Sequence, residues 1–102
     1  LYGARIDIYG NVLDPNGFPI STGSSWEAFP NLSWDGTNFF VVWSDDRDYS
    51  TSYDIYGTRV TPSGEVLDPR GIRISFELEM ALTPCIAFNG SNYFVAWEHD
   101  QG

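Results

Sequence analysis

The sequence contains Val12-Leu13-Asp14-Pro15-Asn16-Gly17, and 54 residues later it reads Val66-Leu67-Asp68-Pro69-Arg70-Gly71. The same offset, without a gap, relates Tyr2-Gly3-Ala4-Arg5 to Tyr56-Gly57-Thr58-Arg59 and Phe40-Val41-Val42-Trp43 to Phe94-Val95-Ala96-Trp97. A fixed period of tens of residues indicates stacked supersecondary units, each of which buries its apolar face against the next. The repeat therefore predicts architecture, and it says little about a ligand.

The composition is that of a folded, acidic chain. Of 102 residues, 42% are apolar and 17% are aromatic, which excludes a disordered acidic tail. The net charge is -9, so the basic stripe that nucleic acid binding requires is missing, and an anionic membrane surface is disfavoured for the same reason. No apolar run approaches the roughly 20 residues of a membrane span. The single Cys85 excludes an intrachain disulfide, and its apolar neighbours predict a buried thiol.

Short β-branched and aromatic runs alternate with Gly, Pro, Asn and Asp, which is the pattern of an all-β chain. The strand at 39–43 is apolar on both alternating faces, so it is expected in a sheet that is covered on both sides. The segments 22–28 and 76–82 are expected to be loops. Each period predicts four strands, which are Asn31–Trp34, Phe39–Trp43, Ile55–Val60 and Glu65–Asp68 with an extension to Ile74. Their counterparts are Cys85–Phe88, Tyr93–Trp97, Leu1–Ile6 and Asn11–Asp14 with an extension to Ile20.

Small four-stranded antiparallel meanders that are covered on both faces and repeated end to end are blades of a β-propeller. A resemblance points the same way and covers nearly the whole chain. It resembles a repeat of propeller-type bacterial secreted and surface proteins in Asp54-Ile55-Tyr56-Gly57-x-Arg59-Val60, Gly64-x-Val66-Leu67-Asp68-Pro69-x-Gly71 and Asn89-Gly90-x-Asn92-Tyr93-x-Val95-x-Trp97. The resemblance implies a propeller fold and a secreted or cell-surface location, and it brings no catalytic motif. The turn at 33–37 lacks the spacing and the following aromatic residue of the sialidase Asp-box, so a sialidase-like function gains no support.

The strand order makes residues 1–102 a single propeller module whose ends fall inside blades. Residues 1–20 form half a blade, 31–74 a complete blade and 84–102 another half blade. Two blades cannot close a ring, and their open edges favour association. A cyclic homo-oligomer, in which half blades of neighbouring chains pair, closes as a dimer, trimer or tetramer with 4, 6 or 8 blades, and we favour the trimer. The alternative is a fragment excised from a larger multi-blade surface protein.

The long loops 21–30, 44–54 and 75–84 are predicted to share one face of the module, where a site is most easily built. Trp26 is expected to stack on a sugar ring, and packing under its loop is the alternative. The acidic loop offers carboxylates to a ligand or to Ca²⁺, although the EF-hand spacing is absent. The alternative is a solvated turn in which Arg47 neutralises a neighbour. The predicted ligand-binding residues are Trp26, Asp45, Asp46, Arg47, Asp48, Tyr49 and Asp100, the last being the counterpart of Asp46.

Other polar and aromatic residues are assigned to structure. Arg5 with Asp14 and Arg59 with Asp68 are expected to form ion pairs between adjacent strands. Trp43 and Trp97 are expected to pack between blades. The only histidine, His99, has no second histidine or paired cysteine with which to bind a metal.

The chain shows no Ser/His/Asp set, no glycine-rich phosphate loop and no paired Cys/His ligands, so neither an enzyme nor a cofactor is expected. The sequence predicts a non-enzymatic, lectin-like binding module, with carbohydrate as the expected ligand and the chain itself as partner. The alternative is a structural or protein–protein interaction scaffold. A weaker third possibility is a hydrolase that uses Asp45 and Asp46. Fold alone does not choose among these, because propellers host many functions.

Overall fold

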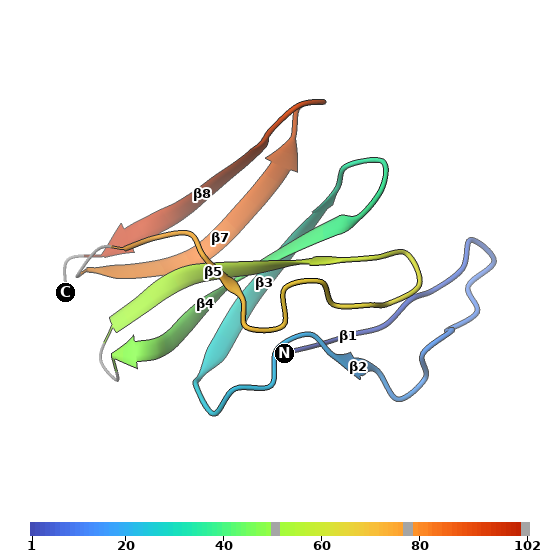
Figure 1. Cartoon of the computed structure of the whole chain (residues 1–102), viewed down its shortest axis with the longest axis horizontal. Coiled ribbons are helices and arrows are strands. Elements are labelled where there is room, and N and C mark those ends of the chain that lie inside the picture. Colours follow the sequence, from blue (N-terminus) through green and yellow to red (C-terminus); the bar gives the residue numbers. More distant parts are fainter. Residues whose placement is uncertain (50–51, 77–78, 101–102) are drawn as a thin grey trace.

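The computed structural model describes residues 1–49, 52–76 and 79–100, and the side chains of Asp48 and Tyr49 lie outside that description. Within these ranges all regular structure is β-strand, arranged in three antiparallel sheets (Figure 1). The predicted all-β class is confirmed. None of the described residues belongs to a helix with the length and apolar character of a membrane span.

The three sheets follow one another along the chain. The first sheet pairs β1 (Tyr2–Gly3) with β2 (Phe18–Pro19). The central sheet contains β3 (Glu27–Trp34), β4 (Phe39–Tyr49), β5 (Ser52–Val60) and β6 (Ile72–Arg73), in that order. The third sheet pairs β7 (Met80–Phe88) with β8 (Tyr93–Asp100). The first and third sheets thus correspond to the second and first halves of the central one.

Strand β4 carries the core because both of its faces are covered. Val41 and Trp43 belong to an apolar cluster that also contains Leu1, Phe18 and Ile20 of the first segment. Val42, which lies between these two residues in the sequence, belongs to a second cluster together with Ile86, Val95 and Trp97 of the third sheet. The predicted alternation of faces is confirmed, and Trp43 and Trp97 each pack between two sheets.

Local geometry repeats at the same offset as the sequence. Asp14 accepts bonds from the Arg5 backbone N–H (2.9 Å) and Nε (2.8 Å), and Asp68 accepts them from Arg59 at 2.9 and 3.0 Å. The predicted ion pairs are therefore confirmed. Each of these aspartates also begins a turn whose fourth residue is a glycine with positive φ, Gly17 or Gly71 at +70° or +77°. A residue with a Cβ is disfavoured there, so the turn depends on glycine.

Two strands begin earlier than predicted. β3 starts at Glu27 and β7 at Met80, within segments that we expected to be loops. Each strand contains a bulge at the same place in the repeat, before Pro30 or Pro84. Proline cannot donate to a strand ladder and is tolerated at bulges, so it marks an irregularity here and not the end of the strand.

The central hairpin is also longer than predicted. β4 continues to Tyr49 and β5 begins at Ser52, so Asp45–Tyr49 is strand and not loop. The predicted strands at 11–14 and 65–68 are wrong in their main part, since each contributes a single bridge, Ile6 to Val12 and Val60 to Val66. The pairing takes place further along, at β2 and β6, because the Asp-Pro turn comes first.

The predicted burial of Cys85 is wrong in the single chain, where its side chain is exposed. It lies on β7, and that strand is covered by the central sheet on one face. Apolar neighbours in the sequence are therefore not enough to bury the Cys85 side chain, since no second sheet covers its face of β7 among the described residues.

Candidate functional site

Three strands of the central sheet meet at one end, where β3 and β5 begin and β4 ends. Trp26, directly before β3, and Asp46 of β4 hold each other there through two hydrogen bonds. The Trp26 backbone N–H donates to Asp46 Oδ1 (2.7 Å), and the Asp46 backbone N–H donates to the Trp26 carbonyl oxygen (3.2 Å). The structure thus brings together two residues that the sequence analysis predicted for the site.

The Trp26 indole is the centre of an aromatic cluster at this end. Its ring centroid lies 5.1 Å from the Tyr53 ring and 6.0 Å from the Phe29 ring, to which it stands edge-on at 74°. Trp26 is 48% exposed and Phe29 is similarly exposed, so aromatic surface remains open to solvent. We call Trp26, Phe29, Asp46 and Tyr53 the rim cluster.

The backbone at Phe29 places its ring in the rim cluster. Its φ is +58°, an uncommon value for a bulky residue, and it lies in the β3 bulge. Thr83, which is 54 positions later in the β7 bulge, has a φ of +49°. The unusual backbone therefore belongs to the repeat. The aromatic side chains belong to the central sheet, because Met80 and Thr83 stand where Trp26 and Phe29 do.

Asp45 lies beside the rim cluster but points into the protein, with 1% of its surface exposed. Its carboxylate accepts hydrogen bonds from Trp43 Nε1 (2.9 Å), the Arg47 backbone N–H (2.8 Å) and the Arg47 guanidinium (2.8 Å). Burial by itself raises the pKa of Asp45, but the hydrogen bonds from Arg47 and Trp43 outweigh it, so the pKa lies below the ordinary value. Asp45 is therefore placed to orient Arg47 and to hold the end of β4.

Arg47 lies flat against the protein surface. Its guanidinium carbon is 3.9 Å from the centroid of the Tyr56 ring, and it also donates to the Arg70 carbonyl oxygen. The hydrogen bond to Asp45 raises the pKa of Arg47, with burial acting in the opposite direction. Arg47 does neutralise a neighbouring carboxylate, that of Asp45. The rest of that interpretation, a solvated turn, is wrong, because Asp45 is buried and the segment is a strand.

One further predicted residue belongs to a different sheet from the rim cluster. Asp100 lies at the end of β8 in the third sheet, paired with Met80. The side chains predicted at Asp48 and Tyr49 fall outside the described residues. Among the side chains that are described, no three from His, Cys, Asp and Glu come together as ligands for a metal ion.

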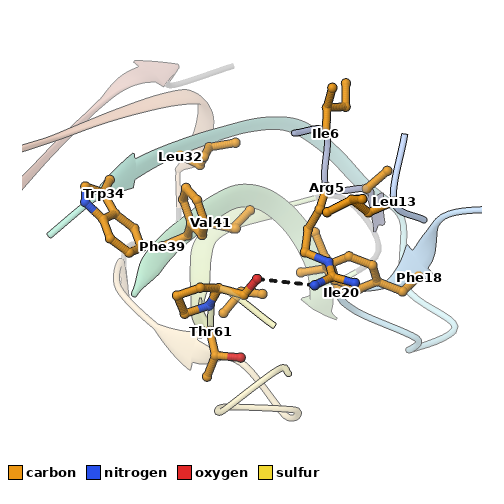
Figure 2. A pocket seen from close by; sticks show the side chains of 14 residues that line it. Arg5, Ile6, Leu13, Phe18, Ile20, Leu32, Trp34, Phe39, Val41 and Thr61 are labelled. Atoms are coloured by element: carbon orange, nitrogen blue, oxygen red, sulfur yellow. Dashed lines mark hydrogen bonds between the residues drawn. The ribbon is translucent and has the colours of Figure 1, made fainter. Parts of the chain in front are cut away.

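A cleft of about 450 Å³ opens between the first sheet and the central sheet. Figure 2 shows that apolar side chains from both sheets converge on it, among them Ile20, Leu32 and Val41. Arg5 crosses one side, where its Nη1 lies 3.5 Å from the Pro62 carbonyl oxygen. The cleft carries few polar groups with which to orient a small ligand.

Comparison of this chain with protein-family models, with curated proteins and with solved structures finds no match. The features of this chain that bear on its function are therefore the rim cluster and the cleft.

Sequence reasoning did not find Phe29 or Tyr53. Tyr53 was inside the predicted loop, and only the pairing of β4 with β5 shows that it returns beside Trp26. Phe29 reaches the cluster through the bulge. The one signal in the sequence was that Phe29 and Tyr53 are aromatic residues placed two positions before the predicted strands 31–34 and 55–60.

Proposed function

We propose that this chain is a non-enzymatic binding module on a β-propeller, and that it binds carbohydrate through the rim cluster. The proposal includes closure of the propeller by self-association, with a trimer of six blades favoured, and a secreted or cell-surface location. The repeat of sheet geometry at the 54-residue offset supports the propeller. The single observation that carries the ligand class is the half-exposed Trp26 indole beside Phe29 and Tyr53, with a carboxylate within the same cluster.

The chemistry of this cluster matches a sugar. The C–H faces of a pyranose ring are apolar and pack on an aromatic face, while its hydroxyls need hydrogen-bond partners at the edge. Asp46 is partly exposed, and its carboxylate has acceptor capacity beyond the bond from the Trp26 N–H. The Tyr53 hydroxyl is a donor and an acceptor. Aromatic surface next to a few polar groups is the usual make-up of a small-molecule site.

The ion pair between the buried Asp45 and Arg47 supports rigidity. Asp45 and Arg47 fix the backbone of β4 on either side of Asp46, so the Asp46 carboxylate needs little reordering when a ligand binds. One shallow site of this size binds weakly. Several copies in a closed ring raise the effective affinity when a glycan presents repeated units.

The experiment is a glycan panel probed with the intact chain, with Trp26→Ala as the test variant. Tyr9→Ala is the matched control, since Tyr9 is an exposed aromatic residue in the 7–10 turn and no part of the rim cluster. We expect saturable binding that Trp26→Ala weakens by about tenfold or more, which corresponds to about 1.4 kcal/mol, and that Tyr9→Ala leaves unchanged. No binding across the panel, or equal binding by both variants, rejects the carbohydrate site and leaves the scaffold.

A further inference from the structure

Phe94 is the most exposed large apolar residue of the third sheet, at 75%. It lies on β8, which pairs with β7 on one side and with no described strand on the other. Its counterpart in the central sheet is Phe40, which is half-buried and lies on β4, between β3 and β5. The two residues occupy the same place in the repeat and differ in what surrounds them.

The surroundings of Phe40 show what this position requires. The Phe40 ring lies 5.0 Å from the Tyr93 ring of the third sheet, at 51°. It also crosses Gly57 of the neighbouring strand β5, where a Cβ would come within 2.5 Å of Phe40 Cε1. Ile86 and Val95 complete the apolar cluster on that side. The Phe40 ring is therefore accommodated by the face of the third sheet and by the absence of a side chain at Gly57.

Gly57, Tyr93 and the apolar residues of the third sheet near them have counterparts that line the cleft in Figure 2. The counterpart of Tyr93 is Phe39, whose ring lies 4.8 Å from Trp34 at 51°, just as Tyr93 lies 5.1 Å from Phe88 at 50°. The counterpart of Gly57 is Gly3 in β1. The matching cleft residues are Gly3, Leu32, Trp34, Phe39 and Val41, the counterparts of Gly57, Ile86, Phe88, Tyr93 and Val95.

We infer that β8 of a second copy of this chain pairs with the open edge of β1 and places its Phe94 in this cleft. The pairing of β4 with β5 gives the register. Val42 lies opposite Gly57 and Phe40 opposite Arg59, so Ala96 of the second copy lies opposite Gly3 and its Phe94 opposite Arg5. The ring of that Phe94 then crosses Gly3 and contacts Phe39.

The occupant is a second copy because the contact continues an interface that the molecule already contains. The third sheet packs on one face of the central sheet, and the cleft is the equivalent interface one repeat earlier, between the first sheet and the opposite face of the central sheet. In the central sheet the equivalent positions are Phe40 and Val42, two residues apart, and β8 presents Phe94 and Ala96 in the same order. At this edge Tyr2 is 70% exposed in the single chain.

This inference rests on the self-association in the proposed function and is independent of carbohydrate binding. The test compares absolute masses in solution for the unmodified chain, Phe94→Asp, Leu32→Asp and the control Ile8→Asp. The three substituted side chains are all exposed, so circular dichroism is expected to show the same fold in each variant. Ile8 lies at the tip of the 7–10 turn, outside the cleft.

We expect the unmodified chain and Ile8→Asp to have the same multiple of the 11.5 kDa subunit mass, and the other two variants to fall to 11.5 kDa. An equimolar mixture of Phe94→Asp and Leu32→Asp should give 23 kDa, twice the subunit mass, because one variant keeps a normal cleft and the other a normal β8.

The unfavourable outcomes differ from one another. If Phe94→Asp keeps the mass of the unmodified chain, or if the mixture stays at the subunit mass, the donor and acceptor named above are wrong while self-association stands. If the unmodified chain has the subunit mass, both are wrong, and the cleft is left to another segment or partner. Loss of glycan binding at unchanged mass affects the carbohydrate proposal alone.

Discussion

The central sheet and the two outer sheets are made from the same repeat, yet their side chains lie in different environments. Tyr56 in the central sheet is 5% exposed, whereas its counterpart Tyr2 is 70% exposed. The turns do not share this difference, since Asp14 and Asp68 make the same bonds to Arg5 and Arg59. Turn geometry in this fold is therefore local, whereas burial requires a complete sheet on each side.

The comparison is tested most severely by the two tryptophans between the sheets. Trp43→Ala removes a buried indole from the central sheet and leaves Asp45 without one of its donors. We expect this variant to lose about 3–5 kcal/mol of unfolding free energy, as large core truncations do. Trp97 is half-buried, so Trp97→Ala is expected to cost less.

Urea unfolding followed by circular dichroism measures both variants at one protein concentration. Equal losses for the two would mean that the outer sheet is as well packed as the central one, which contradicts the comparison.

The buried carboxylate of the central sheet gives the second prediction. His99 stands at the counterpart of Asp45, so the third sheet lacks this ion pair. Asp45→Asn is expected to destabilise the chain by about 1.5–3 kcal/mol at neutral pH, because hydrogen bonds to a buried charge are lost. Its partly exposed neighbour gives the control, since Asp46→Asn is expected to have a smaller effect on stability.

The same residue sets a pH dependence. The pKa of Asp45 in the folded chain lies below its ordinary value of 3.8, since hydrogen bonds outweigh burial. The stability that it contributes is therefore fully present above about pH 4 and is lost as the pH falls through the folded pKa. Unfolding midpoints measured from pH 6 to pH 2 should fall less steeply for Asp45→Asn than for the unmodified chain. Parallel curves would contradict this assignment.

Two glycines give a smaller and sharper comparison. A Cβ at Gly57 would lie 2.5 Å from Phe40 Cε1 and 2.9 Å from the Val41 carbonyl oxygen, so Gly57→Ala is expected to cost about 1–3 kcal/mol through overpacking. A Cβ at Gly3 would meet the end of the flexible Ile20 side chain at 2.8 Å, so Gly3→Ala is expected to cost less in the single chain. Both losses of unfolding free energy are measured at a concentration where the chain is monomeric. Equal losses would mean that the contact at Gly57 is no tighter than the contact at Gly3.

The sequence predicted the parts of the fold that depend on local chemistry or on period. Alternation along β4 placed Val41 and Val42 on opposite faces correctly, because side chains of a strand alternate. The Arg–Asp pairs were also predicted, since their partners lie nine residues apart. The Asp-Pro-x-Gly turns were not, because the predicted strands were extended through them.

What it did not predict depends on contacts between distant residues. The starts of β3 and β7 were not predicted, because each strand has a proline at its bulge and proline was taken as the end of the strand. The burial of Asp45 depends on the fold around Trp43 and Arg47, and the exposure of Cys85 on which sheets cover β7. Trp26 and Asp46 were predicted for the site, but their direct pairing follows from the longer β4, and the arrival of Tyr53 beside them follows from its pairing with β5.

We propose that the open edges of the outer sheets pair between copies of this chain, so that side chains exposed in the single chain become covered. Light scattering on a size-exclusion column measures this directly on the unmodified protein. We expect one species at a whole multiple of the 11.5 kDa subunit mass, larger than the single chain, with 34.5 kDa, three times that mass, favoured. A species at 11.5 kDa over the whole soluble concentration range would contradict it.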